Sequence, residues 1–161
     1  MAEDFSAALT TAQAGSLPDL LGLQWLEATH GRVRGRFDVD KRHMAPNGFL
    51  HAASVIALAD SACGYGCMTS LPEGGASFTT IELKSNFLGT AREGGVAVEA
   101  KLVHGGRNTQ VWDAVVTHRE SGRTLAIGDR EHRDIEVLQC GFRDPHGVGS
   151  LGPGERRVRG R

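Results

Sequence analysis

The middle of the chain holds a long stretch of apolar and small residues with a helical pattern. Apolar side chains recur there at the three- and four-residue spacing of one helix face, at Val55, Leu58, Ala59 and Ala62. This spacing predicts a helix from about Leu50 to Thr69, which Leu71-Pro-Glu-Gly-Gly75 ends. Asp60 is the one acidic residue inside this predicted helix.

Alternating polar and apolar positions on both sides of this helix predict strands. Leu21–Ala28 and Arg32–Val39 precede the helix, and Thr29-His30-Gly31 forms a turn-like break between them. The runs that follow the helix are rich in Thr, Val and Ile and are separated by glycine-containing turns: Ser77–Leu88, Val96–His104, Gln110–His118 and Arg123–Ile127. This order predicts an α+β fold in which one helix packs on an antiparallel sheet.

The two ends of the chain have weaker patterns. Residues from Glu3 to about Ala14 predict a short helix that Ser16-Leu-Pro18 ends. Beyond Ile127 a polar run, Gly128–Asp134, stands where the last strand should continue, and alternation returns only briefly after it. We therefore expect a lead-in at residues 1–19, one domain at residues 20–138 and a disordered Gly- and Arg-rich tail at residues 139–161.

Length and charge limit the classes of function. The 161 residues suffice for one domain with a real core, and no internal repeat or linker indicates a second domain. The formal net charge of −1 argues against a nucleic-acid-binding protein, because such proteins carry a basic footprint. The arginines that do cluster lie at the carboxyl end, where a solvated tail explains them: Arg156, Arg157, Arg159 and Arg161.

Cysteine usage and the amino terminus point to a reducing compartment. The odd number of cysteines, without Cys-x-x-Cys or a His at finger spacing, favours small buried thiols over a zinc site or disulfides. Glu3 and Asp4 stand where a signal peptide is positively charged, and no segment reaches the roughly 18 apolar residues that span a bilayer. We expect a soluble, cytoplasmic protein without a bound metal.

Asp60 is the best candidate for a functional residue. Burial of an unpaired carboxylate among apolar neighbours costs roughly several kcal/mol, so a position in a site explains Asp60 better than a plain core position. The alternative is a buried structural carboxylate that bonds to Ser or backbone groups. The preceding loop, His43–His51, brings polar groups and the turn-forming pair Asn47-Gly48 to the start of the helix.

Four short motifs follow one another in a characteristic order between residues 20 and 127: Asn47-Gly48-Phe-Leu-His51-Ala-Ala, Leu58-Ala59-Asp60-Ser61-Ala, Thr79-Thr-Ile-Glu-Leu-Lys-Ser-Asn-Phe-Leu-Gly-Thr-Ala-Arg92 and Val103-His-Gly-Gly-Arg107. Together they resemble the hotdog-fold acyl-CoA thioesterases, particularly the phenylacetate-pathway type. The resemblance implies a hotdog fold, in which an antiparallel sheet wraps around one long central helix. It also implies hydrolysis of an acyl-CoA thioester to a free acid and CoA, with no cofactor.

The resemblance also assigns roles to residues. The helix acid of the family is the catalytic base or nucleophile, which implies that role for Asp60. The family's His-Gly-Gly is His51-Ala52-Ala53 here, and the first Gly acts through a backbone N–H that Ala52 also has. Many members carry an Asn where this chain has Ala45, so Asn47 is the candidate replacement.

Relatives continue the final strand with apolar residues and stop soon after it. This chain departs from that pattern beyond Ile127. Our hypothesis is that the sequence after Ile127 is a displaced reading frame or a recent extension. Resequencing of the gene tests it, and an intact frame with a well-ordered tail would contradict it.

Thioester hydrolysis needs a polarised carbonyl and a group that delivers oxygen to it. The unpaired N–H groups in the first turn of the helix, at Ala52 and its neighbours, can hold the oxyanion. We assign Asp60, Ala52 and Gly48 to catalysis. The candidates for contact with the substrate are Asn47, His51, Ser61 and Gly64, and the candidates for the CoA phosphates are the turn residues Arg92 and Arg107.

These residues also have structural interpretations. His51 could cap the helix, Ser61 and Gly64 could only permit close packing, and the two arginines could be solvated loop residues.

The helix itself separates two of the catalytic candidates. Ala52 and Asp60 are eight residues apart, which is about 12 Å at 1.5 Å per residue. One carbonyl cannot touch both within a single chain. We therefore predict a two-fold dimer with antiparallel helices, in which one subunit's amide faces the other's Asp60. This agrees with the dimers of the family, and a dimer of dimers is the further expectation.

Two other functions stay open. A hotdog dehydratase or hydratase pairs a loop His with a helix acid, and His43 before Pro46 is superficially similar, although the spacing to Asp60 differs from that motif. A non-catalytic acyl-CoA-binding module would use the same pocket as a sensor, although no helix-turn-helix pattern accompanies it. The sequence pattern does not define the acyl group.

Overall fold

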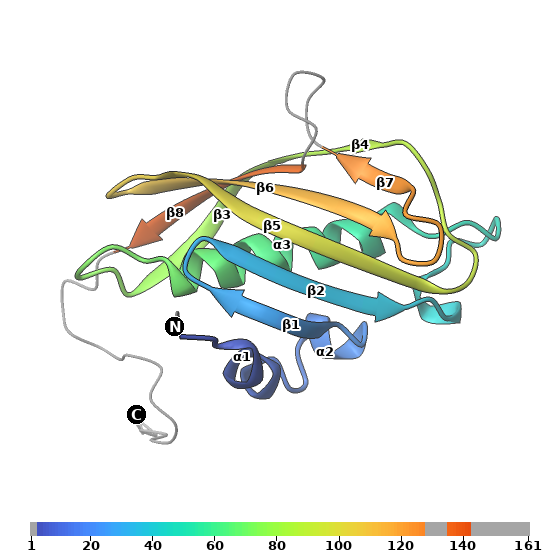
Figure 1. Ribbon diagram of the computed structural model, residues 1–161, viewed down its shortest axis with the longest axis horizontal. Coiled ribbons are helices and arrows are strands. Elements are labelled where there is room, and N and C mark those ends of the chain that lie inside the picture. The colour runs from blue at the N-terminus through green and yellow to red at the C-terminus, as the bar shows by residue number, and fades with distance from the viewer. Residues whose placement is uncertain (1–2, 128–134, 143–161) are drawn as a thin grey trace, which may run out of the picture.

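One curved antiparallel sheet wraps around a single long helix, as the sequence predicts (Figure 1). The computed structural model describes residues 3–127 and 135–142, and of the second range only the backbone. The long helix, α3, spans Ala52–Thr69, so the prediction of a helix from about Leu50 to Thr69 is confirmed. The α+β class is confirmed as well.

Short helices and a 3-10 turn surround this central unit. Helix α1 spans Ser6–Ala12, helix α2 spans Leu17–Leu20, and the 3-10 turn η1 spans Lys41–His43. The strands, in chain order, are β1 Gln24–Thr29, β2 Arg32–Asp38, β3 Ser77–Lys84, β4 Asn86–Phe87, β5 Gly95–Gly105, β6 Thr109–His118, β7 Thr124–Ile127 and β8 Ile135–Phe142.

All strand pairs of the sheet are antiparallel in the described part of the chain. The main path runs β1-β2-β5-β6-β7-β4, and β8 pairs with both β6 and β3. Strands β7 and β8 therefore occupy successive parts of one position beside β6, with Val116 opposite Ala126 and Ala114 opposite Ile135. Strands β4 and β3 occupy the next position outward in the same way.

The structure differs from the predictions mainly at two strands and in one additional short helix. Leu21 is the C-cap residue that follows α2, and Gly22 has a positive φ of 67°, so the first strand begins at Gln24 and not at Leu21. The predicted strand Ser77–Leu88 is divided into β3 and β4. Ser16-Leu-Pro18 does end the first helix, but a second short helix starts there, because Pro is compatible with a first helical turn.

The carboxyl-terminal predictions fall only partly on described residues. Strand β8 reaches Phe142, past Leu138 where the predicted domain ends. The polar run 128–134 and residues 143–161 of the predicted tail lie outside the described residues. The domain boundaries stay a prediction, and the displaced-frame hypothesis still depends on resequencing.

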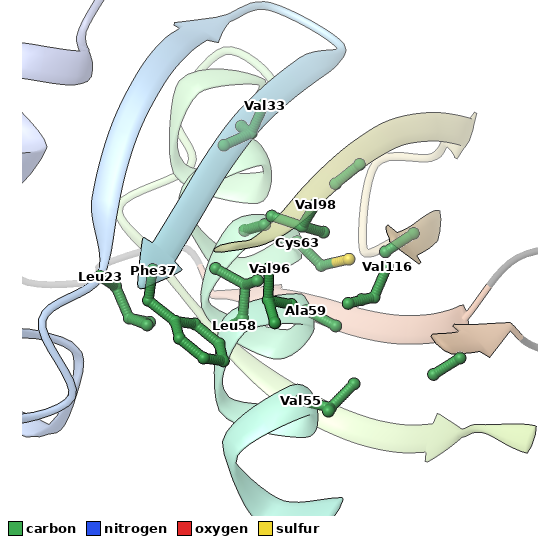
Figure 2. Packing of buried hydrophobic residues seen from close by; sticks show 14 of the residues in the cluster. Leu23, Val33, Phe37, Val55, Leu58, Ala59, Cys63, Val96, Val98 and Val116 are labelled. Atoms are coloured by element: carbon green, nitrogen blue, oxygen red, sulfur yellow. The ribbon is translucent and has the colours of Figure 1, made fainter. Parts of the chain in front are cut away.

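The core lies between α3 and the inner face of the sheet. Buried residues of α3 contact buried residues of β2, β5 and β6 (Figure 2): Val55, Leu58, Ala59 and Cys63 from the helix, and Val33, Phe37, Val96, Val98 and Val116 from the strands. Burial of each Val or Leu side chain stabilises the fold by about 1.5–3 kcal/mol. This packing fixes α3 against the sheet along most of its length.

Glycines let two tryptophans reach the core. A Cβ on Gly66 of α3 would lie 2.5 Å from the Trp112 ring, and a Cβ on Gly35 of β2 would lie 2.5 Å from the Trp25 ring. Each indole N–H donates to a buried glutamine: Trp112 to Gln110 at 2.8 Å, and Trp25 to Gln13 at 2.7 Å. Both large rings are therefore buried without an unpaired donor.

The amino-terminal segment covers the outer edge of β1. The Phe5 N–H donates to the Ala28 carbonyl at 2.8 Å, and the Ala28 N–H donates to Asp4 Oδ1 at 3.0 Å. These bonds block the pairing of another strand at this position of β1. Within residues 3–127 and 135–142, no helix combines the length and apolar character of a membrane span.

Gly66→Ala tests the contact between α3 and Trp112. Helix propensity alone would make alanine more stable by about 0.5–1 kcal/mol. The close approach of Trp112 reverses this sign, so we expect the free energy of unfolding in urea to fall by about 1–3 kcal/mol. In a Trp112→Phe background the loss should be smaller. A Gly66→Ala variant more stable than the original would contradict this packing.

Candidate active site

Asp60 lies in the middle of α3 on the side that faces β3. Thr80 Oγ1 of β3 donates a hydrogen bond to Asp60 Oδ1 at 3.0 Å. The Asp60 side chain is partly exposed, whereas Leu58 and Ala59 beside it are fully buried. The carboxylate is thus held by a neighbouring strand and remains accessible, as a base or nucleophile must be.

Half-exposed residues form one stripe along α3, at Ile56, Ala57, Asp60 and Ser61. Gly64 lies one turn further along the same side of the helix but is buried. A Cβ on Gly64 would lie 2.8 Å from the Phe78 ring of β3, so the glycine makes room for that ring. The structure therefore brings Asp60, Ser61 and Gly64 to one face of the helix. Contacts of Ser61 and Gly64 with a substrate stay a prediction.

The first two residues of α3, Ala52 and Ala53, are exposed, and His51 caps the helix. His51 Nδ1 accepts a hydrogen bond from the Ala53 N–H at 2.9 Å, so His51 is a helix cap. Among the described residues, the Ala52 N–H has no hydrogen-bond partner, and Ala52 is exposed. A backbone donor at the positive end of the helix is therefore accessible to an oxygen atom of a ligand.

Asn47 and Gly48 form a tight turn that is closed by its own hydrogen bonds. The Gly48 N–H donates to the Ala45 carbonyl at 3.0 Å, and Gly48 has a φ of 80°, which favours glycine. Asn47 Oδ1 accepts from the Phe49 N–H at 3.2 Å. In this conformation Gly48 uses its N–H within the turn. The catalytic role of Gly48 and the substrate-binding role of Asn47 stay predictions.

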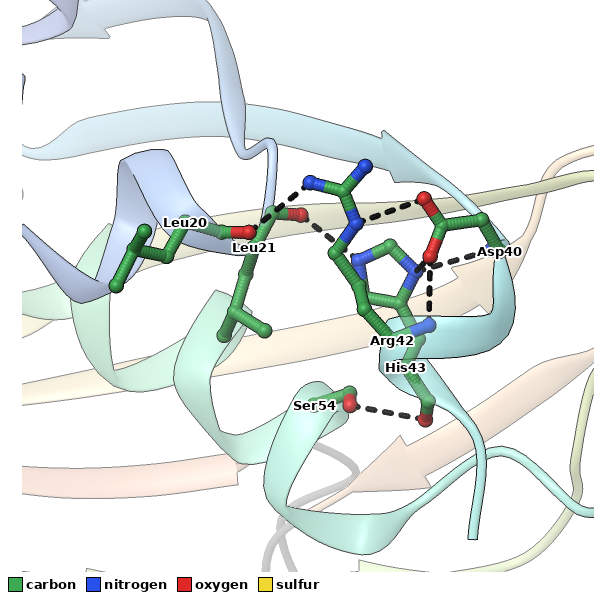
Figure 3. A network of polar contacts seen from close by, with 6 residues as sticks. All are labelled: Leu20, Leu21, Asp40, Arg42, His43 and Ser54. Atoms are coloured by element: carbon green, nitrogen blue, oxygen red, sulfur yellow. Dashed lines mark hydrogen bonds and ion pairs between the residues drawn. The ribbon is translucent and has the colours of Figure 1, made fainter. Parts of the chain in front are cut away.

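His43 joins this loop to the amino-terminal segment (Figure 3). Its ring is buried, and Nδ1 accepts from the Asp40 N–H at 3.0 Å. Nε2 lies 2.7 Å from the Leu21 carbonyl, which can only accept, so Nε2 carries the proton. Both ring nitrogens bond to backbone groups. His43 is therefore not free to transfer a proton, and this weighs against the dehydratase reading.

The same network positions the start of α3. The His43 carbonyl accepts from Ser54 Oγ at 3.0 Å and from the His51 N–H at 2.9 Å. The Arg42 side chain donates to Asp40 at 2.7 Å, and this bond lowers the pKa of Asp40. The His43 ring thus bonds to Asp40 and Leu21, and the His43 carbonyl bonds to the start of α3. Together these hydrogen bonds connect the loop, η1 and the first turn of α3.

Arg92 lies beside the start of α3. The Leu50 N–H donates to Thr90 Oγ1 at 3.2 Å, and Ala91 is buried in the core. These contacts hold the turn before β5 against the loop before α3. The Arg92 guanidinium carbon lies 5.0 Å from the centroid of the exposed Phe49 ring.

Arg107 lies at the other end of α3. It is exposed in the turn between β5 and β6. Gln110, just after this turn, donates to the carbonyl of Ser70 at the carboxyl end of α3 at 2.9 Å. The 18 residues of α3 span about 27 Å. The turn before β5 and the turn between β5 and β6 lie at opposite ends of the sheet in Figure 1, so the structure does not bring the two candidate CoA-binding arginines together within one chain.

Cys63 and Cys67 of α3 are buried thiols, as predicted. Burial raises the pKa of Cys63 well above its ordinary value, which suits packing and not nucleophilic attack. The side chain of Cys140 lies outside the described residues. Within the described ranges, no three His, Cys, Asp or Glu side chains are grouped to hold a metal ion.

Sequence reasoning missed Thr80, Ser54 and Phe49. Thr80 and Ser54 gain their importance only from partners 20 and 11 residues away, and no local pattern marks such pairs. Phe49 did have a signal, because an aromatic residue follows a turn-forming glycine directly before the helix.

The chain is similar to known thioester-cleaving proteins. The family model described as the Thioesterase superfamily matches residues 47–125. ComA2 of Bacillus subtilis, which is named as an esterase, is 32% identical over 78% of this chain and 90% of its own length. The 1,4-dihydroxy-2-naphthoyl-CoA hydrolase of Listeria monocytogenes is 27% identical over 69% of this chain and 89% of its own length.

Solved structures share the fold. The thioesterase PA1618 of Pseudomonas aeruginosa, in a mutant form, has a TM-score of 0.75 at 24% identity, over 84% of this chain and 92% of that chain. The E. coli PaaI protein, from the phenylacetic acid degradation operon, has a TM-score of 0.71 at 18% identity, over 84% and 90%.

His43→Leu tests the role of the buried imidazole. The substitution leaves the Asp40 N–H and the Leu21 carbonyl without their partner, so the free energy of unfolding should fall by about 1–3 kcal/mol. The control is His30→Leu in the exposed turn between β1 and β2, which should stay within about 0.5 kcal/mol. Equal stability of the two variants, measured in urea, would refute a stabilising role for the hydrogen bonds of the His43 ring to Asp40 and Leu21.

Proposed function

The chain belongs to the thioesterase superfamily and has its hotdog fold, and from this premise we propose that it hydrolyses an acyl-CoA thioester with Asp60 as general base or nucleophile. Membership makes it a thioester hydrolase. The CoA carrier, the residues and the shared site described next are our proposal. The position of Asp60 is the observation that carries it.

The surroundings of Asp60 support this role. Leu58, Ala59, Ala62 and Cys63 of α3 are buried in the core, whereas Asp60 is partly exposed in a stripe beside β3. The hydrogen bond from Thr80 Oγ1 orients the carboxylate by one oxygen, Oδ1. A carboxylate that is oriented yet accessible can take a proton from a water molecule, or attack a carbonyl carbon directly.

The exposed start of α3 supports the second half of the chemistry. An oxyanion that forms at the thioester carbonyl needs hydrogen-bond donors placed in advance, each worth about 3 kcal/mol. The accessible Ala52 N–H is the candidate donor, and the positive end of the helix dipole adds to its effect. His51, Ser54 and the His43 carbonyl hold this turn in position.

Because Ala52 and Asp60 lie in one uninterrupted helix, they stay about 12 Å apart in every conformation that keeps α3 intact. We propose that a two-fold dimer with antiparallel helices brings the Ala52 N–H of one protomer to Asp60 of its partner. Each dimer then has two identical sites.

The edges of the sheet favour β3 as the dimer contact. The amino-terminal segment covers β1, whereas β3 pairs with β8 on one side and with no described strand on the other. Thr79, Ile81 and Glu82 of β3 are exposed, and Ile81 is 52% exposed. Pairing of two β3 edges about a two-fold axis would continue the sheet and cover these side chains.

The same dimer would bring the two candidate CoA-binding arginines, Arg92 and Arg107, close together. Antiparallel helices place the carboxyl end of one α3 near the amino end of the other. Arg107 of the partner would then approach Arg92 and the start of α3, and both could bind phosphates of one CoA molecule. A dimer of dimers, a cytoplasmic location and the absence of a cofactor stay predictions.

The reaction follows from these positions. A water oxygen attacks the thioester carbonyl carbon while Asp60 takes a proton, and the Ala52 N–H stabilises the oxyanion. The C–S bond then breaks, and the thiolate of CoA leaves and is protonated. If Asp60 is the nucleophile, an anhydride forms first and water cleaves it. The aromatic CoA substrate named for the Listeria relative makes aryl-CoA a reasonable first test.

Asp60→Asn tests the catalytic proposal. Asparagine keeps the shape and the hydrogen-bond acceptor for Thr80 but cannot act as a base, so kcat for thiol release should fall by about 100- to 10,000-fold. Glu73→Gln, which changes an exposed acid beyond α3, is the control and should retain activity. Equal rates for Asp60→Asn and the original protein would refute the role of Asp60.

A mixture of two inactive variants tests the shared site. Ala52→Pro removes the candidate N–H at the first helical residue, where proline fits, and His51 already has the extended backbone that precedes proline. Refolding of Ala52→Pro together with Asp60→Asn should restore about a quarter of the original activity. The reason is that about half of the dimers are mixed and each mixed dimer has one intact site. A mixture as inactive as its components would contradict a site between protomers.

A further inference from the structure

The contact between Phe49 and Arg92 has no part in the core. Phe49 is 42% exposed, although its backbone is held on both sides: its N–H donates to Asn47 Oδ1, and its carbonyl accepts from the Ala45 N–H. The ring is therefore fixed by the turn while much of its surface stays in water. Exposure of apolar surface is unfavourable, so an aromatic ring in this position suggests a contact that compensates.

The backbone beside Arg92 is fixed by its neighbours, and the Arg92 side chain lies over the Phe49 ring. Ala91 is 4% exposed and belongs to the core, and Thr90 Oγ1 accepts from the Leu50 N–H. The Arg92 guanidinium lies 5.0 Å from the ring centroid, within the range of a cation–π contact. Among the described residues no carboxylate pairs with Arg92. Its N–H donors can therefore serve a bound anion.

We propose that Phe49 is a positioning residue that holds Arg92 for a phosphate group of the thiol carrier, and so makes the enzyme selective for phosphorylated carriers. This inference rests on the proposed function. Phe49 and Ala52 are three positions apart in the chain, which is at most about 10 Å along the backbone. With the length of the Phe49 side chain and the 5.0 Å from its ring centroid added, the Arg92 guanidinium lies within about 20 Å of the candidate oxyanion donor. The phosphates of a thiol carrier are set away from its thioester by the pantetheine arm, which suits such a separation.

Guanidinium and phosphate suit each other in charge and geometry, since parallel N–H donors meet phosphate oxygens. A free arginine side chain loses rotamer entropy when it binds. The Phe49 ring reduces this loss because it restrains the guanidinium before the ligand arrives. The contact between Phe49 and Arg92 does not strengthen the binding of a carrier that has no phosphate group.

The test compares three carriers of one acyl group: acyl-CoA, acyl-phosphopantetheine with one phosphate, and acyl-pantetheine with none. We expect Phe49→Leu to lower the ratio of kcat/KM for acyl-CoA to that for acyl-pantetheine about two- to fivefold, mainly through KM. Phe49→Trp keeps an aromatic face and should restore the ratio. An equal effect with acyl-phosphopantetheine assigns Arg92 to the phosphate nearest the pantetheine, and an effect only with CoA assigns it to the nucleotide end.

Arg92→Gln supplies the coupling test. In that background Phe49→Leu should have no further effect on the ratio, because the ring acts through the guanidinium. Arg123→Gln, at an exposed turn, is the matched control and should retain the original ratio. The proposal is overturned if Phe49→Leu changes turnover of all three carriers equally, if Phe49→Trp fails to restore the ratio, or if the two substitutions are additive.

Failure of the proposed function gives a different result. If the original protein releases no thiol from any carrier, hydrolysis is refuted, and the same variants are compared by calorimetric binding of CoA and of pantetheine. Weaker binding of CoA alone in Phe49→Leu then still supports the positioning role. Equal binding of CoA by Phe49→Leu and the original protein overturns it.

Discussion

The burial of α3 inside one curved sheet is the constraint on which the other features depend. The helix contributes a continuous buried face to the core, and its glycines admit the rings of Phe78 and Trp112 at distances that any other residue would obstruct. A helix enclosed in this way cannot bend or shift without opening the core. The positions of all groups on it are therefore fixed relative to the strands.

Because α3 is rigid, the spacing of Ala52 and Asp60 bears on how the chains assemble. The accessible backbone donor and the accessible carboxylate lie on one straight element about 12 Å apart. No rearrangement of side chains closes that gap. The same reasoning applies to Arg92 and Arg107, which lie near opposite ends of α3. In the proposed dimer, a single two-fold axis with antiparallel helices would remove both separations, and the exposed β3 is where the described sheet could be continued.

The start of α3 is built with more hydrogen bonds than a helix end needs. His51 caps it through its side chain, Ser54 and His51 both bond to the His43 carbonyl, and the His43 ring bonds to the backbone of Asp40 and Leu21. Rigid donors act better on a developing charge than donors that must first be oriented. The polar residues of this loop thus serve to hold the start of α3 in place. The Ala52 N–H is the group that stays accessible.

The amino-acid sequence alone determined the class of fold, because helical and alternating periodicities are local and each residue carries its part of the pattern. It also made Asp60 the candidate catalytic residue, since a single carboxylate within an apolar helical pattern stands out in the sequence. The division of the outer strands at β3/β4 and β7/β8 was not readable, because pairing with β6 and its neighbours decides it. The same holds for the burial of His43, the bond between Thr80 and Asp60, and the contact of Phe49 with Arg92. These depend on residues distant in the chain, and only the folded structure brings such residues together.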